Sequence, residues 1–137
     1  MAWRGVPLPQ CVNESLQIVV FERGPHVSFA NCGLPYFVGG EIAQHDALLL
    51  QTPLSLRARF NIDVRVCTEV VAIDRARHIV KARDASSNSE YEQHYDSLIL
   101  STGAAPLRPP IVGIERAGHF TVRNVPDIDR IVDWITV

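Results

Sequence analysis

The chain has 137 residues, 47% of them hydrophobic, and a formal net charge of −2 at pH 7. This length and apolar content suffice for one domain with its own core. The small net charge gives no electrostatic basis for binding nucleic acid or an anionic membrane. No apolar run approaches the roughly 18 residues of a membrane-spanning helix. We therefore expect neither a nucleic-acid nor a membrane partner.

The three cysteines are odd in number and lack the spacing of a metal site, so we predict no metal. Unpaired thiols favour a reducing compartment. The N-terminus lacks the charged-then-apolar order of a secretion signal. We therefore expect a cytoplasmic protein. Cys11 and Cys67 carry no further signal, and Cys67 is expected to be structural because it lies in a β-branched run.

Residues 16–22 (LQIVVFE) form an apolar, β-branched run that predicts a strand buried in a parallel sheet. Thr52 and Pro53 predict the start of a helix that ends near Asn61. Residues 64–74 predict one further strand, rich in β-branched side chains.

Residues 78–83 and 90–96 alternate apolar and polar side chains around a polar turn and predict an antiparallel meander. Residues 97–100 (SLIL) predict a buried strand that ends in small residues, where a ligand can approach the backbone. Pro126 predicts the start of a helix with an apolar face at Ile128, Ile131, Val132 and Ile135.

Residues 28–40 (SFANCGLPYFVGG) combine one cysteine with small polar residues and glycines. Asn31 is expected to cap a helix whose first turn tolerates Pro35. Cys32 at a helix N-terminus would lie at the positive end of the dipole, which favours the thiolate. The plainer alternative is a cysteine packed in an ordinary loop.

The run Phe21–Val27, followed by residues 28–40, resembles the single-cysteine branch of the FAD-dependent pyridine nucleotide-disulfide oxidoreductases. That branch holds coenzyme A-disulfide reductases, NADH oxidases and NADH-dependent persulfide reductases. The resemblance extends from about Asn13 to the C-terminus. It implies an α/β fold over residues 13–137: a partial Rossmann-like FAD-binding domain with a parallel sheet, helices and a small antiparallel meander, ending before an NAD-binding domain.

The resemblance also implies roles for individual residues. Cys32 would be the catalytic, redox-active thiol. Its family partner five residues later is replaced by Phe37, so no intramolecular disulfide can form there and a mixed disulfide, persulfide or sulfenic acid is expected. Substrate-binding and cofactor-binding positions would be Ser28 and Asn31 for a coenzyme A-type substrate, and Glu22 (ribose), Arg23, the backbone near Val70, Ser101, Thr102 and Gly103 for FAD.

Residues 1–12 read as an irregular leader, although the family has its first strand and the G-x-G-x-x-G turn there. Codons can be chosen for residues 1–14 that, read two bases later, spell Gly-Val-Ala-Gly-Gly-Ala-Ser-Ala-Ala-Val-Arg-Glu. Our hypothesis is that the leader is a frame-shifted or mis-started translation of that turn. The nucleotide sequence tests it.

The implied function is a flavin-dependent NAD(P)H oxidoreductase acting through Cys32 on a coenzyme A disulfide, a persulfide or oxygen, as a homodimer in the full-length family. We expect this chain alone to be inactive, because the pyrophosphate turn, the NAD(P)H domain and the dimerisation domain are absent from it. The alternative is a non-catalytic piece of the FAD domain or a mis-translated gene product.

Overall fold

The computed structural model describes residues 15–136. The predicted leader and Cys11 lie outside these residues. The described chain forms two compact units, which are treated separately: residues 15–28 with 51–102, and residues 29–50 with 103–136. No helix in the described part of the chain is long and apolar enough to cross a membrane.

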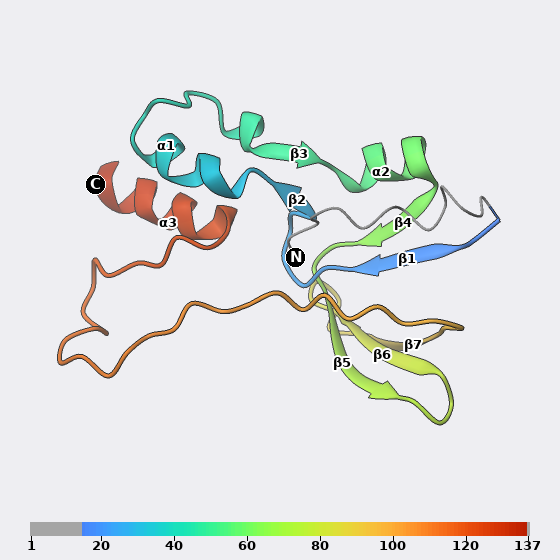
Figure 1. Ribbon diagram of the computed structural model, residues 1–137. Helices are drawn as coiled ribbons and strands as arrows, with labels where there is room; N and C mark the ends of the chain where they lie inside the picture. Colours follow the sequence, from blue (N-terminus) through green and yellow to red (C-terminus); the bar gives the residue numbers. More distant parts are fainter. Residues whose placement is uncertain (1–14, 137) are drawn as a thin grey trace. The chain divides into compact units, whose positions relative to one another are not determined.

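A parallel pair of strands opens the first unit. β1 (Ile18–Phe21) pairs with β4 (Ile62–Arg65), with Ile18 opposite Ile62 and Phe21 opposite Arg65. Figure 1 shows the two strands side by side. Val20 and Ile62 are buried. The strand predicted over residues 16–22 is thus confirmed over Ile18–Phe21, with Val20 in the core.

The helix before β4 begins and ends as the sequence predicts. α2 (Pro53–Phe60) has Thr52 as its N-cap, whose hydroxyl accepts a hydrogen bond from the Ser55 amide at 3.1 Å. The Ser55 hydroxyl in turn accepts one from the Thr52 amide, which completes a capping box. Asn61 ends the helix in the left-handed conformation at φ 50°, a role that suits asparagine.

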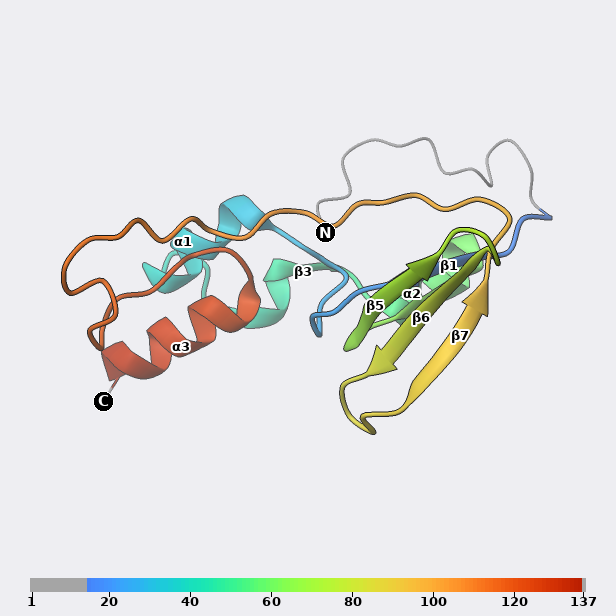
Figure 2. The same ribbon diagram turned by 90° about the horizontal axis from the view of Figure 1, so that it is seen from below.

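The predicted meander is present as an antiparallel sheet in the order β5-β6-β7. Its strands are β5 (Thr68–Asp74), β6 (Ile79–Asp84) and β7 (Glu90–His94), seen together in Figure 2. The central strand buries Ile79, Val80 and Ala82. Alternation of apolar and polar residues thus located the sheet correctly.

The single strand predicted over residues 64–74 is wrong, because the chain turns at Val66 and Cys67. Cys67 adopts φ 51°, and its amide donates to the Gly24 carbonyl at 3.0 Å. The turn separates β4, which pairs with β1, from β5, which begins the antiparallel sheet. Cys67 is therefore a half-buried turn residue and not a strand residue.

The second unit is built mainly from helical segments. These are the 3-10 turns η2 (Asn31–Gly33) and η3 (His45–Leu48), the short helix α1 (Leu34–Val38) and the longer α3 (Val125–Thr136). β2 (Ser28–Phe29) pairs with β3 (Leu49–Gln51) in a short sheet, of which Phe29, Leu49 and Leu50 belong to this unit. The core comprises Leu34, Leu48, Val125 and Ile128, packed against Phe29, Phe37, Val38, Ile42 and Leu49.

The helix predicted from Pro126 is confirmed as α3, although its predicted apolar face is only partly buried. Ile128 is fully buried, whereas Ile135 near the end of the helix is 65% exposed. The N-terminal half of α3 therefore anchors the helix in this core.

The buried strand predicted over residues 97–100 is wrong. These residues are irregular, and Ile99 and Leu100 are 66% and 67% exposed. A segment becomes a strand only when a neighbouring strand takes up its backbone N–H and C=O groups. No described strand pairs with it.

Candidate functional site

β1 carries Glu22 to the carboxyl end of the parallel pair. The Glu22 amide donates to the Arg65 carbonyl at 3.0 Å, and the Glu22 carbonyl accepts from the Thr68 amide at 2.9 Å. The side-chain Oε1 accepts a hydrogen bond from the Gly24 amide at 2.8 Å. The carboxylate is thus held at the end of a parallel strand, where dinucleotide folds place the acid that binds a ribose hydroxyl.

Arg23 and Val70 belong to the same region. Arg23 directly follows Glu22, and Val70 directly follows Glu69, which pairs with Arg23. Arg23 forms an ion pair with Glu69 at 3.6 Å, with side chains 79% and 45% exposed; such an exposed pair contributes little stability. Val70 begins a β-bulge, after which Ala72 pairs with Lys81. A bulge interrupts the ladder and leaves backbone groups unpaired, which suits the predicted backbone contact near Val70.

Cys32 is the exposed centre of the 3-10 turn η2, and its thiol is free. Two contacts with the core hold this turn in place. The Ala30 amide donates a hydrogen bond to the Leu48 carbonyl at 2.8 Å, and Gly33, the last residue of the turn, is buried. A Cβ at Gly33 would lie 3.0 Å from Leu48 Cδ2, so only glycine fits without a shift. A packed core beneath η2 thus presents the thiol to solvent, which contradicts the alternative of a buried cysteine.

The prediction that Asn31 caps a helix is wrong. No side chain caps η2 or α1, and α1 begins only at Leu34, with Gly33 in the N-cap position. The 3-10 turn separates Asn31 from the α-helical amides that a cap would bind. Pro35 lies in the first turn, as predicted. The Asn31 side chain is left exposed beside Cys32 in the sequence.

The remaining predicted positions lie in β2 and in an irregular segment. Ser28 is half-buried in β2, whereas Ser101 and Thr102 are exposed. Gly103 has φ 69°, a conformation that favours glycine. The Ala104 carbonyl that follows accepts a hydrogen bond from Arg123 Nε at 3.1 Å. The Arg123 guanidinium therefore binds the backbone directly after Gly103, a contact that sequence patterns did not reveal.

The predicted site residues are divided between the two units. Glu22, Arg23, Ser28, Val70, Ser101 and Thr102 belong to the first, and Asn31, Cys32 and Gly103 to the second. Within the first unit, Glu22 and the ion pair of Arg23 and Glu69 lie around the β4–β5 turn. Among the described residues, no group of three or more His, Cys, Asp or Glu side chains could hold a metal ion.

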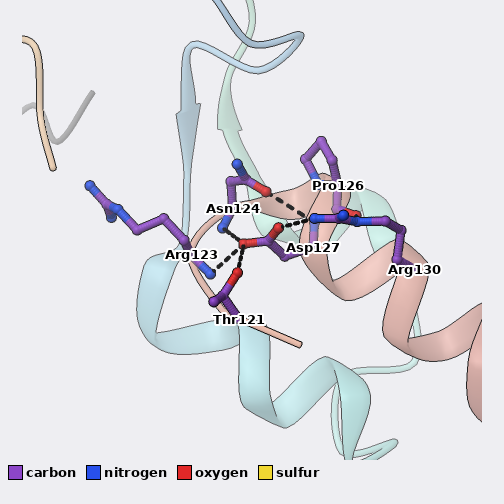
Figure 3. Close-up of polar contacts among 6 residues, drawn as sticks. All are labelled: Thr121, Arg123, Asn124, Pro126, Asp127 and Arg130. Carbon is purple, nitrogen blue, oxygen red and sulfur yellow. Dashed lines mark hydrogen bonds and ion pairs between the residues drawn. The ribbon is translucent and has the colours of Figure 1, made fainter. Parts of the chain in front are cut away.

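A polar cluster at the start of α3, drawn in Figure 3, went unrecognised in the sequence. Asp127 is 5% exposed, and its Oδ2 accepts hydrogen bonds from the Arg123 amide at 2.8 Å and the Asn124 amide at 3.3 Å. The Asp127 amide donates back to Asn124 Oδ1 at 3.0 Å. Thr121 and Arg130 complete the contacts. The spacing of Asn124 and Asp127 matches a capping box, which was the available signal.

The clear pKa shifts are those of Arg65 and Asp84, which both lie outside the predicted site. Partial burial lowers the pKa of Arg65, but hydrogen bonds to Tyr91 and Asp63 outweigh it and raise the pKa above its ordinary value. The Arg65 guanidinium also lies over the rings of Phe21 and Tyr91, 5.5 and 5.4 Å from their centroids. Arg65 thus links β4 to β7 and serves the fold.

Comparison with known proteins identifies the family. Residues 9–134 match the pyridine nucleotide-disulphide oxidoreductase family. The chain belongs to this family. It is 34% identical over 123 residues to the NADH oxidase of Methanocaldococcus jannaschii and 36% identical over 124 residues to the coenzyme A disulfide reductase of Staphylococcus aureus. Each alignment covers 90% of this chain, and 27% and 28% of the two relatives.

Solved structures of family members have the same fold. The reduced CoADR-RHD protein of Bacillus anthracis superimposes with a TM-score of 0.87 at 46% identity, covering 93% of this chain and 23% of that protein. The NAD-dependent persulfide reductase of A. fulgidus gives a TM-score of 0.85 at 36% identity, covering 93% of this chain and 24% of that protein. The predicted α/β, partial Rossmann-like fold is confirmed. The chain spans about a quarter of the length of these relatives.

Proposed function

We propose that this chain supplies the FAD-contacting and thiol-bearing part of a flavin-dependent NAD(P)H oxidoreductase that acts on sulfur substrates. The observation that carries the proposal is an exposed, free Cys32 in a turn fixed by the core, within a sequence that matches the family from residue 9 to residue 134. The names of its relatives support a coenzyme A disulfide, a persulfide or oxygen as the acceptor. A homodimer and a cytoplasmic location remain part of the proposal.

The described residues fit the adenosine part of FAD. Glu22 is an acid at the carboxyl end of a parallel strand, fixed through both its backbone and its side chain. The bulge after Val70 interrupts the ladder of β5, so backbone groups there can contact a ligand. When bound, FAD supplies the hydride-accepting chemistry that no amino-acid side chain provides. Glu22 and the backbone near Val70 would hold it, with Ser101, Thr102 and Gly103 as further contacts.

Cys32 supplies the sulfur chemistry in this proposal. Its thiolate attacks one sulfur of a disulfide, an S–S bond to the substrate forms, and the other half leaves as a thiolate. Phe37 stands five residues later, so no neighbouring thiol at that position can resolve the mixed disulfide. Asn31 and Ser28 would orient the substrate. The exposure of Cys32 gives a bulky disulfide access to the thiol.

A second candidate is a non-catalytic piece of an FAD domain. The exposure of residues 97–100, together with coverage of about a quarter of each relative, favours it for this chain alone. We therefore do not expect the isolated chain to turn over substrate. For this reason FAD binding and the reaction of the Cys32 thiol are measured in separate experiments.

Titration of the purified chain with FAD, followed by flavin fluorescence, tests the cofactor part. We expect saturable binding that Glu22→Gln weakens about tenfold, the effect of losing roughly 1.4 kcal/mol. Glu41→Gln, an exposed glutamate in the second unit, is the matched control and should bind as the wild type does. No binding by the wild type, or equal binding by the Glu22 variant, would contradict the proposed cofactor site.

Intact mass spectrometry after incubation with coenzyme A disulfide tests the thiol. We expect one coenzyme A adduct on the wild type and on Cys67→Ser, and loss of that adduct in Cys32→Ser. Cys67 is the matched control because it is half-buried in a turn. Equal modification of the Cys32 variant would refute the assignment even if FAD binds.

A further inference from the structure

The turn between β4 and β5 contains an uncommon backbone conformation. The non-glycine residues with positive φ in the described chain are Asn61, His78, Asn88 and Cys67. Asparagine and histidine are enriched in this conformation, whereas cysteine is not. A residue held there costs free energy and persists only where the contacts around it impose the conformation. The φ of 51° at Cys67 therefore raises the question of what those contacts hold in place.

The amides of this turn bind the segment that carries Glu22. The Cys67 amide donates to the Gly24 carbonyl at 3.0 Å, and the Thr68 amide donates to the Glu22 carbonyl at 2.9 Å. On the other side, the Cys67 carbonyl accepts a hydrogen bond from the Ala85 amide at 2.8 Å. The turn thus joins the segment from Glu22 to Gly24 to the antiparallel sheet, and all of these residues belong to the first unit.

A buried hydroxyl group holds the turn from within. Thr68 is 3% exposed, and its Oγ1 donates to the Val66 carbonyl at 3.0 Å. Because Val66 and Thr68 flank Cys67 in the sequence, this hydrogen bond spans the residue with positive φ. Thr68 is also the first residue of β5, where it pairs with Asp84 of β6. Loss of the hydroxyl would leave the turn without the side-chain contact that closes it.

We propose that Thr68 is a positioning residue for the Glu22 carboxylate, an inference that rests on the FAD site proposed above. The Thr68 hydroxyl fixes the turn, and the amides of the turn fix the backbone of Glu22 and Gly24. The Gly24 amide then donates to Glu22 Oε1 at 2.8 Å, so the orientation of the carboxylate depends on the same segment. A carboxylate held in one orientation binds a ribose hydroxyl without the cost of ordering it first. Thr68 acts through the backbone in this arrangement and not by touching the cofactor.

Amide hydrogen exchange measured by NMR tests this role without any cofactor. Thr68→Val removes the hydroxyl and should speed exchange of the Gly24 and Cys67 amides about fivefold, the effect of losing one neutral hydrogen bond. Thr68→Ser keeps the hydroxyl and should restore the slow exchange. Ile79→Val is the control, because Ile79 is buried in the same sheet but pairs with Asp74 at the far end of β5. Equal exchange in wild type and Thr68→Val, or equally fast exchange in the Ile79 control, would overturn the proposal.

FAD titration followed by flavin fluorescence tests whether the position of Glu22 affects the cofactor. Thr68→Val should raise the dissociation constant about fivefold, and Thr68→Ser should restore it. In the Glu22→Gln background, Thr68→Val should add less than about twofold, because the acid that it positions is already changed. Effects that simply multiply would show that Thr68 supports the fold in general, and would refute the positioning role. Absence of FAD binding by the wild type would contradict the proposed cofactor site instead, and the exchange rates would still decide whether Thr68 positions Glu22.

Discussion

Asp127 fixes the start of α3, and its replacement gives a quantitative test of how the second unit is held together. The side chain is 7% exposed and lies where the chain enters the helix. Its Oδ2 accepts from two backbone amides, those of Arg123 and Asn124, and from the Thr121 hydroxyl at 3.4 Å. Asp127→Ala removes every one of these contacts and leaves the donors without this acceptor.

The contacts differ in strength, which sets the expected loss of stability. A hydrogen bond to a charged acceptor contributes about 1.5–3 kcal/mol, and the 2.8 Å bond from the Arg123 amide belongs in that range. The bonds from Asn124 at 3.3 Å and Thr121 at 3.4 Å are longer and together add about 1 kcal/mol. The Arg130 side chain is 67% exposed, so its ion pair adds little. We expect Asp127→Ala to lower the free energy of unfolding by about 3 kcal/mol.

Asn124→Ala should lower the free energy of unfolding by about 1 kcal/mol, the usual effect of losing an N-cap. Because the two residues form one capping box, the double variant should lose about 1 kcal/mol less than the sum of the single losses. Asp133→Ala changes an exposed aspartate of the same helix and serves as the control, with an expected change within about 0.5 kcal/mol.

Urea unfolding followed by Trp134 fluorescence measures these differences in the second unit, with Trp3→Phe as the background. Trp134 lies on α3, and its ring is 5.9 Å from that of Phe120, so its emission reports on this helix. At an m-value of about 2 kcal/mol/M, the Asp127→Ala midpoint should fall by about 1.5 M. A midpoint within about 0.3 M of the parent, or strictly additive single losses, would refute the capping-box argument.

Two further predictions concern the meander turn and the thiol turn. Hydrogen bonds from the Ser86 hydroxyl, the Ser87 and Ser86 amides and the Ser87 hydroxyl lower the pKa of Asp84 to about 2. Because the folded-state pKa is depressed, the stabilisation by Asp84 is full above its unfolded value of about 3.9 and is lost as pH falls through about 2. The stability difference between wild type and Asp84→Asn, from urea unfolding at a series of pH values, should therefore shrink from pH 4 to pH 2; a constant difference would contradict this. Gly33→Ala places a Cβ 3.0 Å from Leu48 Cδ2 and should lower stability by about 1–3 kcal/mol and change the rate at which a disulfide reagent modifies Cys32. An unchanged melting temperature and rate would show that the core beneath η2 yields freely.

Sequence patterns located those elements whose signals are local. Thr52, Pro53 and Asn61 mark the ends of α2 through their own backbone and side-chain preferences, and the structure has the helix between them. The meander followed from the alternation of apolar and polar residues, which β7 shows as alternately exposed and half-buried positions. The break at Cys67 was missed because β-branched residues run through it, and only the change of partner from β1 to β6 requires a turn there.

The site was predictable only where a motif is read directly from residue types. The SFANCG segment identified the family, and Glu22 lies at the strand end that the motif implies. The role expected of Asn31 failed because a 3-10 turn and an α-helical first turn have similar sequences but offer different amides to a cap. Arg123 was missed because its contact with the Ala104 carbonyl joins residues nineteen positions apart, a pairing that no local pattern encodes.

Residues 97–100 show why a strong strand sequence does not by itself make a strand. Three of these four residues are apolar, as all four of β1 are, yet β1 is ordered into a sheet and they are not. The two segments differ in whether a strand lies beside them. Ile18 to Phe21 pair with β4 in register, whereas no described strand pairs with Leu98 to Leu100. Since the backbone groups of a parallel strand are satisfied only by adjacent strands, the order of this segment depends on what pairs with it. FAD contacts at the adjoining Ser101 and Thr102 would depend on that pairing too.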